Sequence, residues 1–196
     1  MKENGFEYVD LGLPSNTMWA TCNVGATKPE DEGLLFQFGR VDGYKYGDKN
    51  HGFVTEENYS TTSGKKYECG DILDKEDDAA HINMGSKWHM PTYDELRELY
   101  YRTKCKQEIV NGVRGIMFTS NINGQQLFIP FIKGYWDGHN NVFEHWDILS
   151  GFIYSSQVNY SNSNNSYMLF CYFQDNVYVD HEHHSYAFPV RGVFKK

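Results

Sequence analysis

The chain has 196 residues, of which 40% are apolar and 22% are charged, and its formal net charge is −8. This composition is typical of a globular protein, and we treat residues 1–196 as a single domain. No Lys or Arg occurs at positions 134–190, a stretch with six acidic side chains. Nucleic acids and anionic membranes bind basic surfaces, so we exclude nucleic acid as a partner and expect no membrane insertion. The first residues also lack the apolar run of a signal peptide.

The first third of the chain indicates short extended segments separated by turns. Residues 6–11 alternate apolar and polar side chains, residues 18–24 are extended, and residues 34–38 are apolar. From Arg40 to Gly70 the sequence contains only turn signals, such as Asp42-Gly43. A loop of this length in a compact domain often has a role of its own. Contact between this loop and a neighbouring subunit is left open.

Two helices are expected next. The first begins near Asp74, where acidic side chains favour the helix dipole, and it ends at Gly85. Thr92 and Glu95 form a capping box at the start of the second helix, which then presents an apolar face. The acids at 74–78 lack the glycine and glutamate positions of an EF-hand loop. A capped helix start is therefore the better explanation than a calcium site.

The second half of the chain indicates antiparallel strands. Residues 115–119 and 126–130 alternate around Asn123-Gly124, which predicts a hairpin. Residues 134–145 are predicted to form a loop, and residues 151–156 a strand. Residues 167–173 and 177–179 are predicted to pair, and residues 187–194 to form the last strand. The predicted fold class is α+β, with two helices in the first half and antiparallel strands in the second.

The segment 159–186 has an unusual composition. Of its 28 residues, 19 are Asn, Ser, Tyr, His or Asp, and five of these are Tyr. Tyr supplies large, stiff contact area, while Ser and Asn adapt their hydrogen bonds, as in known recognition surfaces. The alternative interpretation is that the segment 159–186 is an ordinary polar edge of a sheet with a loop and has no binding role. The candidate ligand-binding residues are Tyr160, Asn162, Asn164, Asn165, Tyr172, Tyr178, Asp180, His181, His183 and His184, with Trp136 and Trp146 as neighbours.

No pattern of catalysis or cofactor binding is present. His181 and His183 would share one strand face, but the sequence places no further ligands for a metal, so we expect no metal and no cofactor. No nucleophile motif occurs, so we expect no enzymatic activity. The four cysteines form no Cys-x-x-Cys pair, and they are either free buried thiols or two disulfides.

Several segments together resemble the "major paralogous" domain of Bacteroidetes and Fibrobacter. They are residues 8–15 (YVDLGLPS), 19–26 (WATCNVGA), 77–80 (DDAA), 88–96 (WHMPTYDEL), 154–156 (YSS) and 190–193 (VRGV). The resemblance implies a C-type-lectin-like fold, shared with formylglycine-generating enzymes, in which the N- and C-terminal strands pair. That pairing would place residues 9–11 beside residues 190–193. The catalytic cysteines of those enzymes have no counterpart here, so the resemblance does not carry over their activity.

The same domain resembles the variable proteins that retroelements diversify in gut bacteria and their phages. In such proteins the ligand-binding residues lie in C-terminal strands and loops, where altered Asn codons yield Tyr, Ser, His and Asp. The resemblance therefore implies a phage receptor-binding or tail-tip adhesin, located in the virion, that recognises a host surface protein or glycan. The alternative is an adhesin of the bacterial surface or extracellular space. A homotrimer or contact with other virion proteins is part of the same expectation.

Overall fold

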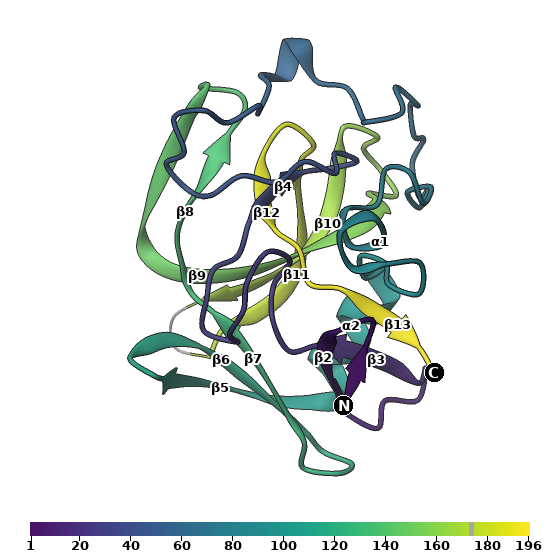
Figure 1. Cartoon of the computed structure of the whole chain (residues 1–196), viewed down its shortest axis with the longest axis vertical. Helices are drawn as coiled ribbons and strands as arrows, with labels where there is room; N and C mark the ends of the chain where they lie inside the picture. The colour runs from purple at the N-terminus through teal and green to yellow at the C-terminus, as the bar shows by residue number, and fades with distance from the viewer. Residues whose placement is uncertain (173–174) are drawn as a thin grey trace.

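A computed structural model describes residues 1–172 and 175–196, although not the side chains of residues 146–149. The fold is mostly β, because strands make up 41% of the residues and helices only 10%. Within the described residues the strands form three antiparallel sheets, and the helices lie in the middle of the chain (Figure 1). The predicted α+β class with helices in the first half, and the C-type-lectin-like arrangement given with it, is therefore wrong.

The terminal sheet joins the two ends of the chain. It contains β1 (Lys2–Glu3), β2 (Phe6–Asp10), β3 (Thr17–Ala20) and β13 (Val193–Lys195) in that order. The N- and C-terminal strands thus share a sheet, as expected, but β13 pairs with β3 and not with β2. Val9 and Val193 both lie opposite Trp19, so β3 separates the two segments that were expected to touch.

The central sheet has six strands. Its order is β11 (Val177–His183), β10 (Asn165–Tyr172), β9 (Val142–Val158), β8 (Ile132–Asp137), β12 (Ala187–Pro189) and β4 (Leu35–Gln37). The predicted pairing of the last two long strands is confirmed, because β10 and β11 form an antiparallel hairpin. Phe173, at the end of that predicted strand, lies outside the described residues. The predicted final strand at 187–194 is wrong, since residues 190–192 divide it between two sheets.

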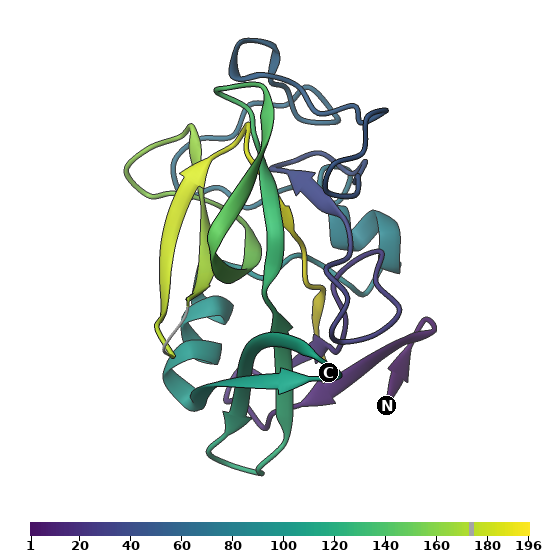
Figure 2. The ribbon, with the colours of Figure 1, turned by 90° about the vertical axis from the view of Figure 1, so that its left-hand side faces the viewer.

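The segment 134–145 forms a hairpin and not the predicted loop. β8 and β9 pair directly across it (Figure 2). Gly134, which suggested a loop, is required by close packing, because a Cβ there would lie 2.1 Å from the carbonyl oxygen of Glu144. The Asp137 carboxylate accepts hydrogen bonds from the backbone N–H groups of His139 and Asn140 at 2.8 and 2.9 Å, which closes the turn.

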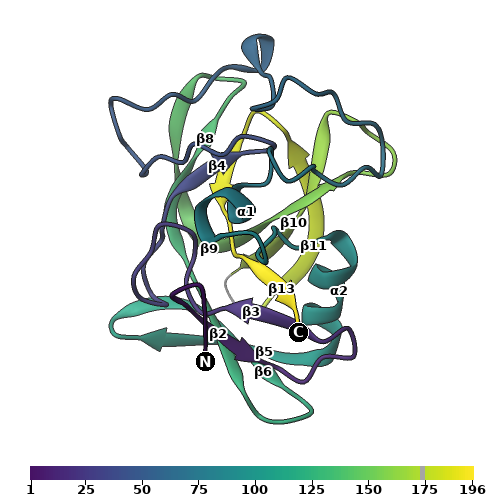
Figure 3. The same cartoon turned by 45° about the vertical axis from the view of Figure 1, so that its right-hand side comes forward.

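The third sheet and the helices complete the fold. The sheet contains β5 (Thr103–Val110), β6 (Val113–Ser120) and β7 (Gln126–Pro130), and it confirms the hairpin predicted around Asn123-Gly124. α1 (Ala79–Met84) is capped by Asp78 and not by Asp74. α2 (Tyr93–Arg102) has the predicted capping box of Thr92 and Glu95. Figure 3 shows α1 and α2 on the side of the molecule where β13 ends.

The central sheet separates two apolar cores. Side chains alternate between the two faces of a strand. Tyr154 on β9 and Met168 on β10 therefore belong to one cluster with Phe38, while their neighbours Ile153 and Leu169 belong to the other. The long strands β9 and β10 thus form a rigid wall with packed side chains on both faces. The loops at the ends of these strands are attached to a well-fixed scaffold.

Arg191 connects the terminal sheet to the sheet that contains β7. Its side chain is fully buried. Nε donates to the side-chain oxygen of Asn23 at 2.8 Å, and the two terminal nitrogens donate to the carbonyl oxygens of Ala20 and Phe128 at 3.1 and 3.3 Å. Burial lowers the pKa of Arg191 to about 10, so the guanidinium stays charged at neutral pH.

Candidate binding site

Four segments that are distant in the sequence meet at one end of the molecule, which we call the upper end. They are residues 56–68, 138–141, 159–165 and 183–186 (Figure 1). Backbone hydrogen bonds join them: Glu56 N–H donates to the Gly138 carbonyl at 3.0 Å, and His184 N–H donates to the Asn164 carbonyl at 2.9 Å. Loops that a rigid sheet holds in place are a common location for binding residues.

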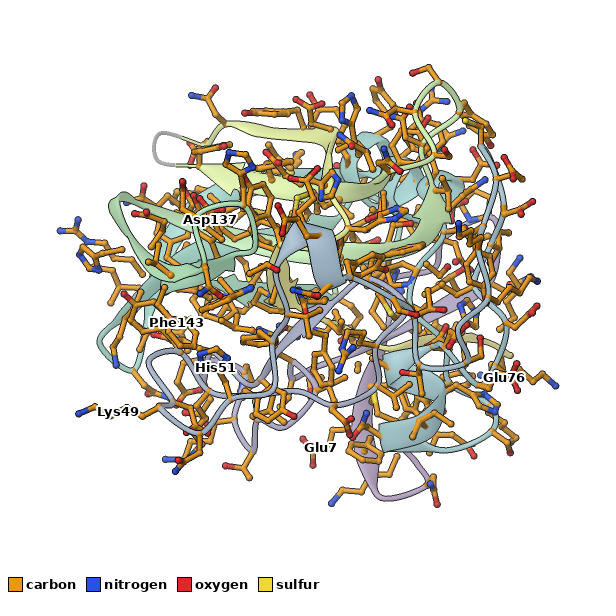
Figure 4. The ribbon with its side chains drawn as sticks, turned by 90° about the horizontal axis from the view of Figure 1, so that it is seen from above. Glu7, Lys49, His51, Glu76, Asp137 and Phe143 are labelled. Carbon is orange, nitrogen blue, oxygen red and sulfur yellow. The ribbon has the colours of Figure 1, made fainter. Side chains whose placement is uncertain are left out.

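Aromatic packing fixes the first part of the long 40–70 loop. His51 lies beside Phe143 of β9, with ring centroids 5.0 Å apart, and beside Trp136 of β8 at 4.5 Å (Figure 4). The side-chain amide of Gln37 donates to the Val54 carbonyl at 2.7 Å and accepts from the Val54 N–H at 3.0 Å. The loop is therefore attached both to the β8–β9 hairpin and to β4.

Asp77 fixes the second part of the same loop. Its buried carboxylate accepts hydrogen bonds from the N–H and hydroxyl of Ser63, at 2.7 and 2.6 Å, and from the Tyr67 hydroxyl at 2.7 Å. Within the acidic stretch 74–78, Asp78 therefore caps α1, whereas Asp77 holds the loop in place. Among the described residues no group of three or more His, Cys, Asp and Glu side chains is arranged to hold a metal ion.

A pocket of about 520 Å³ lies between this loop and the upper ends of β10 and β11. Lys65, Lys66 and Tyr67 line one side, and Asn164, His183 and His184 line the other. Its volume lies within the usual range for sites that take small ligands or parts of larger ones. We call it the upper pocket.

His184 forms part of the pocket wall and is buried, although the sequence analysis placed it on an exposed surface. Its ring stacks on Phe38, with centroids 4.2 Å apart and planes at 16°. The residue is 6% exposed, and its Nε2 is buried without a hydrogen-bond partner among the described residues. Burial lowers the pKa of His184 to about 3, so the imidazole is neutral at physiological pH.

Glu56 links two histidines at the edge of the upper pocket. Its carboxylate oxygens lie 3.1 Å from Nδ1 of His139 and 3.4 Å from Nε2 of His183. The hydrogen bond with His139 and the nearby His183 lower the pKa of Glu56, while burial lowers the pKa of His183. The sequence analysis missed Glu56 and His139, because no local pattern relates residues 83 positions apart.

Tyr172 and Tyr178 form an aromatic strip with Phe170 on one face of the β10–β11 hairpin. The three ring centroids are 5.4–5.8 Å apart, and the rings are nearly parallel. Phe170 is buried, Tyr172 is half-buried, and Tyr178 is 41% exposed on β11, the edge strand. Asp180 is exposed two residues further along β11, so its side chain lies on the same face as that of Tyr178.

The remaining predicted residues lie in the turn between β9 and β10 and on β10 and β11. The Tyr160 hydroxyl accepts a hydrogen bond from Gln157 at 3.0 Å, and the Asn165 amide lies 2.9 Å from Nδ1 of His181. Asn162 is exposed in the connecting turn. The ten residues thus occupy the upper pocket, the aromatic strip, and this third area. Of the two predicted neighbours, Trp136 is buried, and the Trp146 side chain lies outside the described residues.

The four cysteines are all free thiols, which leaves no disulfide among them. Cys171 is fully buried, and burial raises the pKa of its thiol. None of the helices in the described part of the chain has the length and apolar character needed to cross a bilayer.

Searches against protein-family models, curated proteins and solved structures each gave no match. The family resemblance therefore rests on the sequence motifs alone.

Proposed function

We propose that the chain is a non-enzymatic binding protein that recognises a macromolecular partner through the aromatic strip on the β10–β11 hairpin. The partner is a host surface protein or glycan, and the setting that the motifs favour is a phage tail adhesin. An adhesin of the bacterial surface is the alternative. The arrangement of Phe170, Tyr172 and Tyr178, which extends from the core to an exposed sheet edge, carries this proposal.

The strip has the features of a preorganised contact surface. The buried ring of Phe170 holds the two tyrosines in stacked positions, so little side-chain entropy is lost when a partner binds. Tyrosine offers apolar area together with a hydroxyl group, which is why it is enriched where binding energy concentrates. Asp180 adds a charged group beside the rings, and charge at a sheet edge also opposes unwanted pairing with other strands.

Cys171, on β10, lacks the properties of a catalytic cysteine. A catalytic cysteine has to be accessible and to form a thiolate readily. Cys171 is fully buried between the sheet and α2, and the pKa of its thiol is raised, so it has the opposite properties. We therefore assign Cys171 to the packing of the core.

Binding of the purified protein to intact Bacteroidales cells tests the proposal. Tyr178→Ala should weaken saturable binding at least about tenfold, because an interface tyrosine commonly contributes more than 1 kcal/mol. Tyr101→Ala on α2 is the matched control, since Tyr101 is 64% exposed and lies outside the strip. Equal binding by the wild type and Tyr178→Ala, with both folded, would remove the strip from any role in recognition.

A further inference from the structure

We propose that a second surface, distinct from the aromatic strip, binds a sugar that carries a carboxylate, as a uronic or sialic acid unit of a glycan does. Its residues are Tyr93 and Arg97 on α2, Tyr160 in the turn between β9 and β10, and Tyr167 on β10. We call them the tyrosine–arginine cluster. The Tyr160 ring stacks on the C–H face of the sugar, and the Arg97 guanidinium binds the carboxylate. None of the strip residues belongs to this cluster, so the site does not rest on the proposed function.

The three tyrosine rings of the cluster contact one another and leave one ring open to solvent. The centroids of Tyr93 and Tyr167 are 4.2 Å apart, and the Tyr160 ring lies 5.8 Å from Tyr93 and 5.6 Å from Tyr167. Tyr167 is buried, whereas Tyr160 is 56% exposed. Exposed tyrosines that rest on a packed base are common anchors of binding surfaces. The Tyr160 ring therefore offers a ligand an aromatic surface.

Hydrogen bonds and close packing fix the orientation of the Tyr160 ring. The side-chain amide of Gln157 donates to the Tyr160 hydroxyl at 3.0 Å, and its oxygen accepts from the Tyr93 N–H at 3.1 Å. The Tyr167 hydroxyl accepts from the Tyr160 N–H at 3.1 Å. Gly70 packs against the same ring, since a Cβ there would lie 3.0 Å from it. The ring therefore loses little conformational freedom when a ligand stacks on it.

Arg97 is a cation that is held in position while its hydrogen-bond donors stay unused. Its guanidinium carbon lies 5.3 Å from the ring centroid of Tyr93 and 5.4 Å from that of Tyr101, which are four residues away on either side along α2. Arg97 is exposed, and it forms no hydrogen bond or ion pair with the described residues. A guanidinium presents its N–H donors in one plane, which matches the two oxygens of a carboxylate.

The charges on α2 favour a ligand with a single negative charge. Residues 134–190 contain no Lys or Arg, so α2 supplies the cation beside the 159–165 turn. Glu95 is buried, and Glu98 accepts a hydrogen bond from the Ser15 N–H at 3.0 Å, so neither carboxylate is available to Arg97. Asp94 is exposed three residues before Arg97 and forms no ion pair with it in the described residues. A phosphate would bring a second negative charge near Asp94 without a second cation.

The rim of the cluster suits a sugar better than an acidic peptide. Ser161 and Asn162 follow Tyr160 directly and are exposed, so they bring a hydroxyl and an amide beside the ring. A sugar ring has an apolar C–H face for Tyr160 and hydroxyl groups at its edge for these side chains. An extended acidic peptide offers carboxylates to Arg97 but no matching ring face.

NMR titrations of the wild-type protein, observed at the tyrosine rings and the arginine Nε–H groups, test the inference. The anionic probes are methyl glucuronide and the methyl glycoside of N-acetylneuraminic acid, the neutral probe is methyl glucoside, and the peptide probe is triglutamate. We expect at least one anionic sugar to shift the Tyr160 and Arg97 signals in a saturable way, and methyl glucoside to bind at least about tenfold more weakly. No saturable shift with either anionic sugar, a response to triglutamate alone, or equal affinity for charged and neutral sugars would overturn the inference.

Variants at exposed positions assign the two roles and separate this site from the aromatic strip. Arg97→Gln should weaken binding of the anionic sugar about tenfold and remove the preference over methyl glucoside, and Tyr160→Ala should weaken it to a similar extent. Tyr101→Ala leaves Arg97 on the Tyr93 ring, and Tyr178→Ala changes only the strip, so both should retain sugar binding within about twofold. Unchanged sugar binding in folded Arg97→Gln or Tyr160→Ala would contradict the site. Loss of cell binding in Tyr178→Ala bears on the proposed function alone.

Discussion

Arg191 and His184 are both buried basic side chains near the C-terminus, but their surroundings differ. Each of the three nitrogens of Arg191 donates to an oxygen of the protein, and the side chain joins β3, β7 and the segment that links β12 to β13. Nε2 of His184 is buried without a hydrogen-bond partner among the described residues, although the residue lines a pocket. A buried polar group whose hydrogen bonds the protein completes is structural. One that the protein leaves incomplete reduces stability, at a cost of about 1–3 kcal/mol.

Replacement of Arg191 should have the largest effect on stability. Arg191→Met leaves three buried oxygen acceptors without donors, each at a cost of about 1–3 kcal/mol. We expect the free energy of unfolding to fall by roughly 3–5 kcal/mol in urea titrations. Arg191→Lys retains the charge but not the planar arrangement of donors, so its loss should be intermediate. A loss below about 1 kcal/mol in Arg191→Met would contradict the structural role.

The pH dependence of stability should reveal His184. Its pKa is about 3 in the folded protein and 6.5 ordinarily, so the unfolded chain takes up a proton first as the pH falls. Stability should therefore decrease below pH 6.5 at up to about 1.4 kcal/mol per pH unit, which amounts to about 3 kcal/mol at pH 4. His183 has a lowered pKa as well and acts in the same direction. Urea titrations of His184→Gln, which cannot titrate, should show a shallower slope, and identical slopes would refute the assignment.

Asp77 should affect the pocket more than the core. Asp77→Ala removes the acceptor for the Ser63 and Tyr67 donors, and we expect a loss of about 1–3 kcal/mol in the free energy of unfolding. Limited proteolysis should cut residues 60–68 faster, because Ser63 and Tyr67 lose the acceptor that holds them. Asp77→Asn keeps one oxygen acceptor and serves as the milder control. Unchanged proteolysis in Asp77→Ala would show that other contacts hold the loop.

Glu56 should give the smallest effect. Its side chain is exposed and its pKa is lowered, so its contacts with His139 and His183 contribute above its ordinary pKa of 4.5 and are lost as the pH falls through the lowered value. In Glu56→Gln we expect little change in the unfolding midpoint but faster hydrogen exchange of the amides of η1 (Glu56–Asn58) at neutral pH. The difference from the wild type should disappear at low pH. Equal exchange at neutral pH would mean that the Glu56 contacts do not hold η1.

Local signals in the sequence predicted the elements that depend on neighbouring residues. The capping box of Thr92 and Glu95 and the turn at Asn123-Gly124 are examples, since each is complete within a few positions. The β8–β9 hairpin was missed because Gly134 is a close-packing glycine and because an Asp137 turn with Asn141 at φ 59° has the composition of a loop. Glycine and asparagine in a run of aromatic residues are therefore ambiguous signals.

The arrangement of the candidate site residues could be predicted only in part, for a physical reason. Composition identified the β10–β11 hairpin, but it could not show which of its side chains point inward. His184 lies in a turn after β11, where its N–H bonds to the Asn164 carbonyl, and its ring is buried against Phe38 from a distant part of the chain. The partners of Glu56 and the position of Lys65 likewise depend on contacts that no local spacing encodes.

The division of the C-terminal segment between two sheets has a consequence for folding during synthesis. β4 pairs with β12, so that Leu35 lies opposite Pro189, and β3 pairs with β13, so that Thr17 lies opposite Lys195. Neither sheet can close until residues 187–195 have left the ribosome, although the strands that await them are among the first to be made. Closing such long loops is slow. A nascent chain arrested before residue 187 would therefore leave the edges of β3 and β4 without these partners.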